Sequence, residues 1–306
     1  MPLPFNIIIN NVAFADICDD LNLSPIDKKT VLGIANEYED GKWQYSKFYR
    51  FIWNNIQEDA LNKKERDSVI MEPASCLEKA AANLRITDGD IAGGEIAEIL
   101  LYGIMKNYYN ALPVVPKIYY KQNRNDYAKG ADSVHIVIEG EDSFSLWLGE
   151  AKFYDSIENV RLKEIVESVK NTLSLQGMKK ECAIITGLSD LDDFPEINDS
   201  LRRNIRTMLK QETSVDVIKP ILHIPIMLLY ECEITSREKH YTDAYKNRIE
   251  TYQKNRANAY FKKQINLCKD VDLYSEINFH IILFPVPNKT EIVNSFLSRA
   301  RNLRYE

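Results

Sequence analysis

The sequence predicts an α/β protein with a mixed central β-sheet flanked by helices. Apolar runs of strand length and amphipathic runs of helix length follow one another in the order strand, strand, strand, helix, strand, helix, strand, which favours helices packed over a sheet. With 306 residues, 45% hydrophobic and 27% charged, the chain has the composition of a folded globular protein. We expect a single domain over residues 1–306, with a mostly helical N-terminal elaboration (1–88), a core (89–233) and a C-terminal helix–strand–helix segment (234–306).

The core is expected to begin with a helix, a short strand and a β-hairpin. Residues 91–109 have the apolar spacing of an amphipathic helix, and prolines punctuate the β-rich run at 114–120, which suits a first or edge strand. Residues 132–138 and 143–152 alternate in polarity around a polar turn, the pattern of two paired strands.

The rest of the chain continues the alternation of helices and strands. Asp155 and Ser156 can cap a helix whose apolar stripe includes Leu162 and Val166. The other expected elements are strands at 182–185, 223–230 and 277–284, and helices at 197–210, 236–268 and 290–303.

Neither a leader nor a membrane span is expected. The first residues lack the basic flank, the long apolar run and the small-residue cleavage site of a signal peptide. The longest apolar runs fall well below the roughly 20 residues that a spanning helix needs. We expect a cytoplasmic protein without a membrane partner.

Net charge and residue content disfavour several kinds of binding and metal site. A net charge of -6 argues against a protein that coats nucleic acid by bulk electrostatics, although it allows a nuclease whose cationic contacts are local or come from a partner. Five dispersed cysteines without a C-x-x-C pair, and four histidines without metal-ligand spacing, predict neither a disulfide framework nor a zinc site.

Two acids and a lysine are expected to meet at one end of the hairpin. If residues 140–142 form a three-residue loop, Asp132 pairs with Glu150, with Cβ atoms roughly 5 Å apart. A loop of two or four residues, or a bulge, would shift this register by one. Lys152 lies two residues beyond Glu150 and so points to the same side of the sheet.

This group of side chains suits metal-assisted phosphodiester hydrolysis. Two close carboxylates are tolerated chiefly when a cation or a proton lies between them. Mg²⁺, with Mn²⁺ as its substitute, is the natural occupant because it takes oxygen ligands, to which the Ala151 carbonyl could add. The Lys152 ammonium can orient a water or stabilise charge on phosphorus. The alternative is an ordinary surface ion pair between Glu150 and Lys152.

The helix before the hairpin offers a further carboxylate. Glu95, Glu98 and Tyr102 fall at i, i+3 and i+7, so they share one face of that helix. Either glutamate is also explained as the polar edge of an amphipathic helix.

These residues resemble the PD-(D/E)XK nuclease superfamily, whose core is an α-β-β-β-α-β unit with two acids and a lysine at its centre. Asp132 takes the position of the first acid, Glu150 the second and Lys152 the lysine, while Ala131 stands where the motif's name has proline. More narrowly, residues 94–102 (GEIAEILLY), 129–132 (KGAD) and 148–154 (LGEAKFY) resemble the HamA effectors of the Hachiman anti-phage system. The resemblance is specific over about residues 92–175 and diffuse elsewhere.

The resemblance implies a restriction-endonuclease-like fold, with residues 89–233 as the catalytic core. It also implies a metal-dependent deoxyribonuclease of bacterial defence that cleaves DNA together with a partner helicase, HamB. A glutamate of the first helix often joins the metal in this superfamily, so Glu98 is the first choice and Glu95 the second. Two other functions stay open: a catalytically silent nuclease-fold adaptor that binds the helicase or DNA, and a stand-alone restriction-type endonuclease.

Two polar segments suit contact with DNA or with a partner. Residues 241–263 interleave lysines and arginines with tyrosines on a helix, and the loop at 121–130 carries cations and a tyrosine. A solvated helix face and a solvated loop are the respective alternatives.

Overall fold

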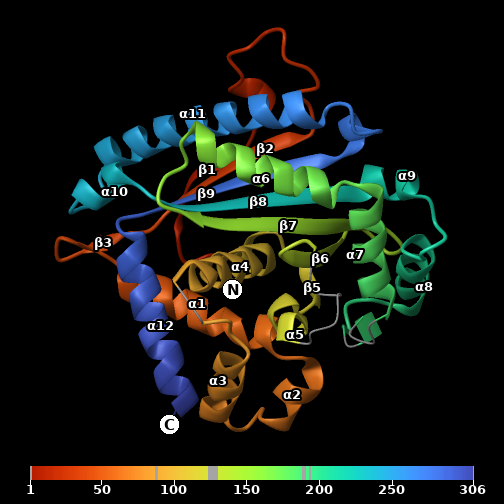
Figure 1. Cartoon of the computed structure of the whole chain (residues 1–306), viewed down its shortest axis with the longest axis horizontal. Coiled ribbons are helices and arrows are strands. Elements are labelled where there is room, and N and C mark those ends of the chain that lie inside the picture. Colours follow the sequence, from red (N-terminus) through yellow and green to blue (C-terminus); the bar gives the residue numbers. More distant parts are fainter. Residues whose placement is uncertain (1, 87–88, 123–129, 188–190, 193, 306) are drawn as a thin grey trace.

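A seven-stranded mixed sheet forms the centre of the protein. The computed structural model describes residues 2–86, 89–122, 130–187, 191–192 and 194–305. The strands of the sheet are β1 (Asn6–Ala13), β2 (Lys29–Ala35), β5 (Leu112–Val115), β6 (Ser133–Ile138), β7 (Phe144–Tyr154), β8 (Leu222–Glu231) and β9 (Asn278–Val286). Their order is β1-β2-β9-β8-β7-β6-β5 (Figure 1). Strands β2, β9, β8 and β7 run parallel, and the pairs β1–β2, β7–β6 and β6–β5 are antiparallel.

Helices cover both faces of this sheet. They are α1 (Tyr45–Ala60), α2 (Lys63–Ser68), α3 (Pro73–Ala82), α4 (Gly89–Tyr108), α5 (Lys117–Gln122), α6 (Asn159–Thr172), α7 (Leu175–Gly187), α8 (Asp199–Met208), α9 (Val215–Ile218), α10 (Glu233–Arg237), α11 (Asp243–Cys268) and α12 (Lys289–Tyr305). Helices α6 and α11 lie over one face, and α1, α4 and α12 over the other (Figure 1). The predicted mixed sheet flanked by helices is confirmed. Within the described ranges, no helix has both the length and the apolar character that a membrane crossing requires.

The apolar core is divided by the sheet into two layers. Alternate residues of β7 supply them: Leu146 and Leu148 join the layer under α6 and α11, whereas Trp147 and Ala151 join the layer over α4. Strand β8 is buried at nearly every position, as expected for a parallel strand covered on both faces. Helices on both sides therefore hold β7 and β8 in place.

The N-terminal region contributes strands as well as the expected helices. Helices α1 to α3 agree with a mostly helical region, but β1 and β2 precede them, followed by the small hairpin of β3 (Tyr38–Glu39) and β4 (Lys42–Trp43). Strand β2 pairs in parallel with β9, so segments from the two ends of the chain lie side by side in the sheet.

Three local predictions are wrong. The expected strand at 182–185 lies inside α7, because its apolar residues belong to a helical stripe that includes Met178 and Cys182. The expected strand at 114–120 ends at Val115, and α5 begins two residues later, after Pro116, which cannot donate to a ladder. Helix α6 begins at Asn159, so Glu158 is its N-cap residue and the expected cap at 155–156 lies outside the helix.

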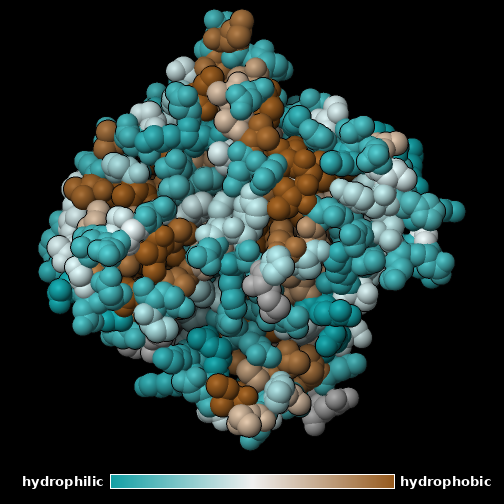
Figure 2. All heavy atoms as spheres, turned by 180° about the vertical axis from the view of Figure 1, so that it is seen from behind, coloured by the Kyte–Doolittle hydropathy of each residue, from teal (hydrophilic) through white to brown (hydrophobic). Residues whose placement is uncertain are grey.

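The back of the molecule is mainly hydrophilic. Apolar side chains on this face form several patches, and each patch is bordered by hydrophilic residues (Figure 2). Apolar patches of this kind are ordinary, because apolar atoms contribute more than half of a typical protein surface. The groups with distinctive chemistry lie instead around β7 and α6.

Candidate active site

The hairpin of β6 and β7 has the register that the sequence predicts. Ser133 pairs with Gly149 and Ile138 with Phe144, and the Glu139 amide donates to the Ser143 carbonyl at 2.9 Å. Residues 140–142 are then left as the loop. The pairing ends at Ser133 and Gly149, so Asp132 lies just before β6, and its own amide donates to the same Gly149 carbonyl at 2.8 Å.

Asp132 is bound to the strand opposite. Its Oδ2 accepts a hydrogen bond from the Ala151 amide at 3.0 Å and lies 3.4 Å from Lys152 Nζ. The N–H and C=O of one residue in a strand point toward the same neighbour. The Ala151 carbonyl is therefore directed toward the Asp132 side of β7, which suits its predicted role as a further oxygen ligand.

Glu150 is a buried carboxylate held by helix α6. Its Oε2 accepts from Ser168 Oγ at 2.8 Å and its Oε1 from Thr172 Oγ1 at 3.1 Å, and only 2% of the residue is exposed. Burial and, after it, the charge of Asp132 raise the pKa of Glu150 to about 7, although Lys152 and the two hydroxyls partly offset the rise. The carboxylate therefore lacks part of the positive charge that its ionised form needs.

Lys152 lies between the two acids. Its Nζ is 3.4 Å from Asp132 Oδ2 and 3.7 Å from Glu150 Oε2. Burial lowers the pKa of Lys152, but the carboxylates of Asp132, Glu150 and Glu98 outweigh burial, so the net pKa is raised. The ammonium is accordingly charged at neutral pH.

The two helix glutamates differ in their surroundings. Both carboxylate oxygens of Glu95 accept from the Arg85 amide, at 2.8 and 2.9 Å, so Glu95 secures the segment before α4. Glu98 is also buried, and its charge acts on Lys152. The effect of the Glu98 charge on Lys152 favours Glu98 over Glu95 as the neighbour of the hairpin acids, and a role for Glu98 at a metal stays a prediction. Tyr102, on the same face, donates to Glu58 instead.

A buried ion pair positions the residues before Asp132. Glu181 of α7 lies 2.8 Å from Lys117 of α5, both side chains are 1% exposed, and the other Glu181 oxygen accepts from the Ala131 amide at 2.8 Å. A Cβ on Gly130 would collide with this carboxylate. Glycine at position 130 therefore lets Glu181 reach the backbone beside Asp132.

Gly149 has a comparable role on β7. A Cβ there would lie 2.8 Å from the Leu101 side chain of α4 and would also collide with Ser133 Oγ. Because real Cβ atoms do not approach so closely, a side chain at 149 would push α4 or β6 away from β7. The glycine that precedes Glu150 thus permits the close packing of helix and hairpin.

A pocket of about 460 Å³ opens beside Glu150. Its walls come from β7, α6, α7 and the segment before Asp132, and include Ser168, Asn171, Gln176 and Lys180. The pocket is lined by Glu150 and also by Lys180. A phosphate group is therefore chemically suited to it.

The donor set at the hairpin fits a hard divalent cation. Asp132 and Glu150 supply carboxylate oxygens, and an ammonium already lies between them, so the position stabilises positive charge. Mg²⁺ needs only one or two carboxylates because it retains waters. In the part of the chain that the structure describes, no three acidic, histidine or cysteine side chains are arranged to hold a metal. The protein ligands would thus come mainly from these two acids and the Ala151 carbonyl.

Sequence reasoning missed four residues of the site. Ser168 and Thr172 carried a weak signal, since they lie at i and i+4 along the apolar stripe of α6. Lys117 and Glu181 carried none, because their contact joins elements 64 residues apart. The cationic loop expected at 121–130 lies almost wholly outside the described residues.

Comparison with known families identifies a match over most of the chain. A sequence model of the HamA family matches residues 12–300 of the 306-residue chain. No curated protein matches it. The family match covers the hairpin, α4, α6 and strands from both ends of the sheet. The chain therefore belongs to the HamA family, a component of the Hachiman defence system.

Proposed function

We propose that this HamA protein is a metal-dependent DNA nuclease that cleaves phosphodiester bonds together with a partner helicase. The observation that carries the proposal is the position of Lys152 between two acids at one end of the hairpin. Its ammonium lies 3.4 Å from the Asp132 carboxylate and 3.7 Å from the Glu150 carboxylate. The order α4, β5, β6, β7, α6, β8 also follows the α-β-β-β-α-β core of the nuclease superfamily, with α5 inserted between β5 and β6 and α7 to α9 before β8.

Each side chain has a distinct role in the proposed reaction. Asp132 and Glu150 would hold Mg²⁺, or Mn²⁺ in its place, and the metal when bound supplies charge stabilisation at the scissile phosphate. Lys152 orients the attacking water or stabilises the negative charge that develops on phosphorus. Ser168 and Thr172 keep the Glu150 carboxylate directed at the pocket, and Glu98 supports the charge of Lys152.

The negative net charge of the chain favours a mechanism in which a partner brings DNA to the catalytic site. A net charge of -6 opposes tight binding of a polyanion by the whole surface. A helicase that moves along DNA would raise the local concentration of substrate at the site. We expect the isolated chain to bind DNA weakly at physiological salt, and tight binding there would contradict this view.

Plasmid cleavage with Mg²⁺, ATP and the helicase encoded beside this protein tests the proposal. We expect Glu150→Ala and Lys152→Ala to lose cleavage by about a hundredfold or more, with fold and partner binding intact. Glu141→Ala in the exposed turn and Lys239→Ala on the surface are matched controls that should cleave normally. Cleavage by Glu150→Ala at the wild-type rate would reject the site. Normal helicase binding without cleavage by the wild type would favour the silent adaptor.

A further inference from the structure

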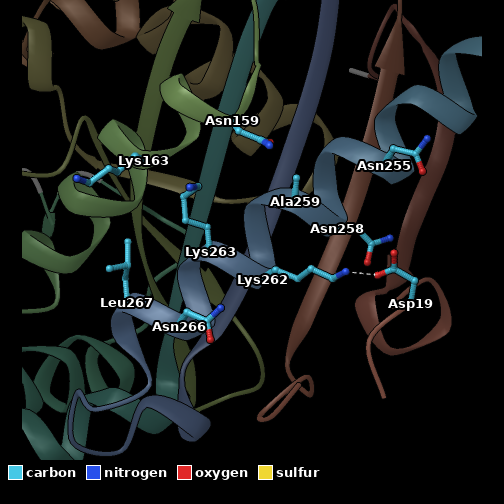
Figure 3. Close-up of a pocket in the computed structure, with 10 residues that line it drawn as sticks. All are labelled: Asp19, Asn159, Lys163, Asn255, Asn258, Ala259, Lys262, Lys263, Asn266 and Leu267. Carbon is cyan, nitrogen blue, oxygen red and sulfur yellow. Dashed lines mark ion pairs between the residues drawn. The ribbon is translucent and has the colours of Figure 1, made fainter. Parts of the chain in front are cut away.

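Outside the catalytic pocket, the most distinctive polar feature is the seam between α6 and α11. A cavity of about 670 Å³ opens along it (Figure 3). Its lining consists of three lysines, four asparagines, one aspartate and two small or apolar residues: Lys163, Lys262, Lys263, Asn159, Asn255, Asn258, Asn266, Asp19, Ala259 and Leu267. Positive charge and amide donors are therefore concentrated here on a chain whose net charge is negative.

The two helices of the seam run parallel. The Arg256 guanidinium donates to Glu158 at 3.2 Å and to Asn159 Oδ1 at 3.4 Å, which fixes the start of α6 beside the middle of α11. At the other end, burial raises the pKa of Cys268 to about 11 while the nearby Lys170 charge opposes the rise. The cavity follows α11 from Asn255 to Asn266, about 17 Å at 1.5 Å per residue, with Asn159 and Lys163 of α6 on one side and Asp19 on the other (Figure 3).

Several donors of the seam are available to a ligand. Lys263 rises from α11 toward α6, between Asn159 and Lys163 (Figure 3). Across the residues described here, Lys263 makes no ion pair or hydrogen bond, and Asn255 and Asn266 make no side-chain hydrogen bond. Lys163 has only a 3.6 Å pair with the exposed Glu167. These cations and amides are therefore free to bind an anion.

Helix α6 also connects the seam to the catalytic pocket. At about 100° per residue, Asn159 and Ser168 point roughly 180° apart around the helix axis. Asn159 and Lys163 line the seam, whereas Ser168 and Thr172 bind Glu150 on the opposite flank. The two sites thus lie on opposite sides of α6, and Asn159 and Ser168 are also about 14 Å apart along the helix axis.

We propose that the α6–α11 seam binds the phosphodiester backbone of DNA beside the cleavage pocket, an inference that rests on the proposed nuclease function. Lysine ammonium and asparagine amide groups are common phosphate contacts, and about 17 Å matches roughly five nucleotides at 3.4 Å each. The lining has neither the aromatic platforms of a single-strand site nor the apolar centre of a protein interface. A duplex backbone is therefore the fitting ligand.

The Asp19 carboxylate occupies one of the cations of the seam, Lys262. Its Oδ1 lies 2.6 Å from Lys262 Nζ, and that hydrogen bond lowers the pKa of Asp19 (Figure 3). A phosphate at Lys262 has to compete with this carboxylate. Removing the Asp19 charge should consequently strengthen DNA binding, an effect opposite in sign to removing the lysines.

Fluorescence anisotropy with a labelled duplex of about 20 base pairs, in EDTA, measures DNA binding by the seam without cleavage. We expect Lys163→Gln/Lys263→Gln to bind about tenfold more weakly at about 50 mM salt, with the slope of log affinity against log salt reduced by about 1.8, at 0.9 per phosphate contact. The control Lys42→Gln/Lys239→Gln removes two exposed lysines elsewhere and should bind like the wild type. Asp19→Asn should bind more tightly, with a steeper slope.

Three results would overturn the proposal. They are wild-type affinity and slope in the seam variant, no DNA binding by the wild type at low salt, and displacement of DNA by polyglutamate at equal charge concentration. The last would assign the seam to acidic protein segments. Because the readout needs no metal, loss of binding in the seam variant beside wild-type cleavage by Glu150→Ala would retain the seam and reject the catalytic assignment. The reverse pattern would reject the seam alone.

Discussion

Replacing Glu150 with glutamine should stabilise the metal-free fold at alkaline pH while removing its metal-binding charge. The carboxyl group has an ordinary pKa of 4.5 when unfolded and about 7 when folded, because it is buried and faces Asp132. The stability contributed by the neutral carboxyl is fully present below about pH 4.5 and is lost as the pH rises through about 7. The Glu150→Gln variant should not share that loss, since its side chain stays neutral.

The difference between the two pKa values sets the size of the effect. At about 1.4 kcal/mol per pH unit, a rise from 4.5 to about 7 corresponds to roughly 3 kcal/mol of unfolding free energy. For a chain of this size that corresponds to about 6 °C in Tm, at roughly 2 °C per kcal/mol. The variant and the wild type should therefore have nearly equal stability at about pH 4.5 and should differ most at about pH 8.5.

Urea and thermal unfolding in EDTA at both pH values measure this difference, and added Mg²⁺ provides a second arm. A cation bound beside ionised Glu150 should raise the Tm of the wild type at about pH 8.5 and have little effect on Glu150→Gln. Glu164→Gln, a change on the exposed face of α6, is the control. A pH-independent difference between Glu150→Gln and the wild type would refute the reasoning, because it would mean that Glu150 does not titrate differently on folding.

Three other substitutions probe the groups around the acids. Lys117→Met leaves the Glu181 carboxylate buried without its cation and should lower the unfolding free energy by roughly 3–5 kcal/mol in urea titrations; an unchanged midpoint would contradict the buried pair. Gly130→Ala should displace that carboxylate and reduce plasmid cleavage by about tenfold, with normal helicase binding as the control. Ser168→Ala removes a hydrogen bond that favours ionised Glu150, so the alkaline shift of the pH–rate profile is the expected sign, and an acidic shift would oppose it.

The hairpin could be predicted from sequence because its rules are local. Strand parity aligns Lys152 with Glu150, and the length of the turn fixes the pairing of Ser133 with Gly149, the neighbours of Asp132 and Glu150. Strand β8 was likewise predictable, since a continuous apolar run of that length suits a strand covered on both faces.

Features that depend on distant contacts could not be predicted in this way. Strands β1 and β2 enter the sheet through β9, whose residue His280 pairs with Thr30 across 250 positions. The apolar residues at 182–185 fit a strand or a helix equally well until the rest of α7 is considered. Glu181 has no local signature, because its partners lie on α5 and beside Asp132.

The place of β9 in the sheet bears on how the protein is made. This strand lies between β2 and β8, yet residues 278–286 leave the ribosome after every other strand. Until β9 is made, β2 and β8 lack the strand that pairs with both of them. The sheet is then incomplete beside β8, the strand on which β7 packs. We expect cotranslational folding to assemble the acid–lysine centre last, so that nascent chains carry no competent cleavage site.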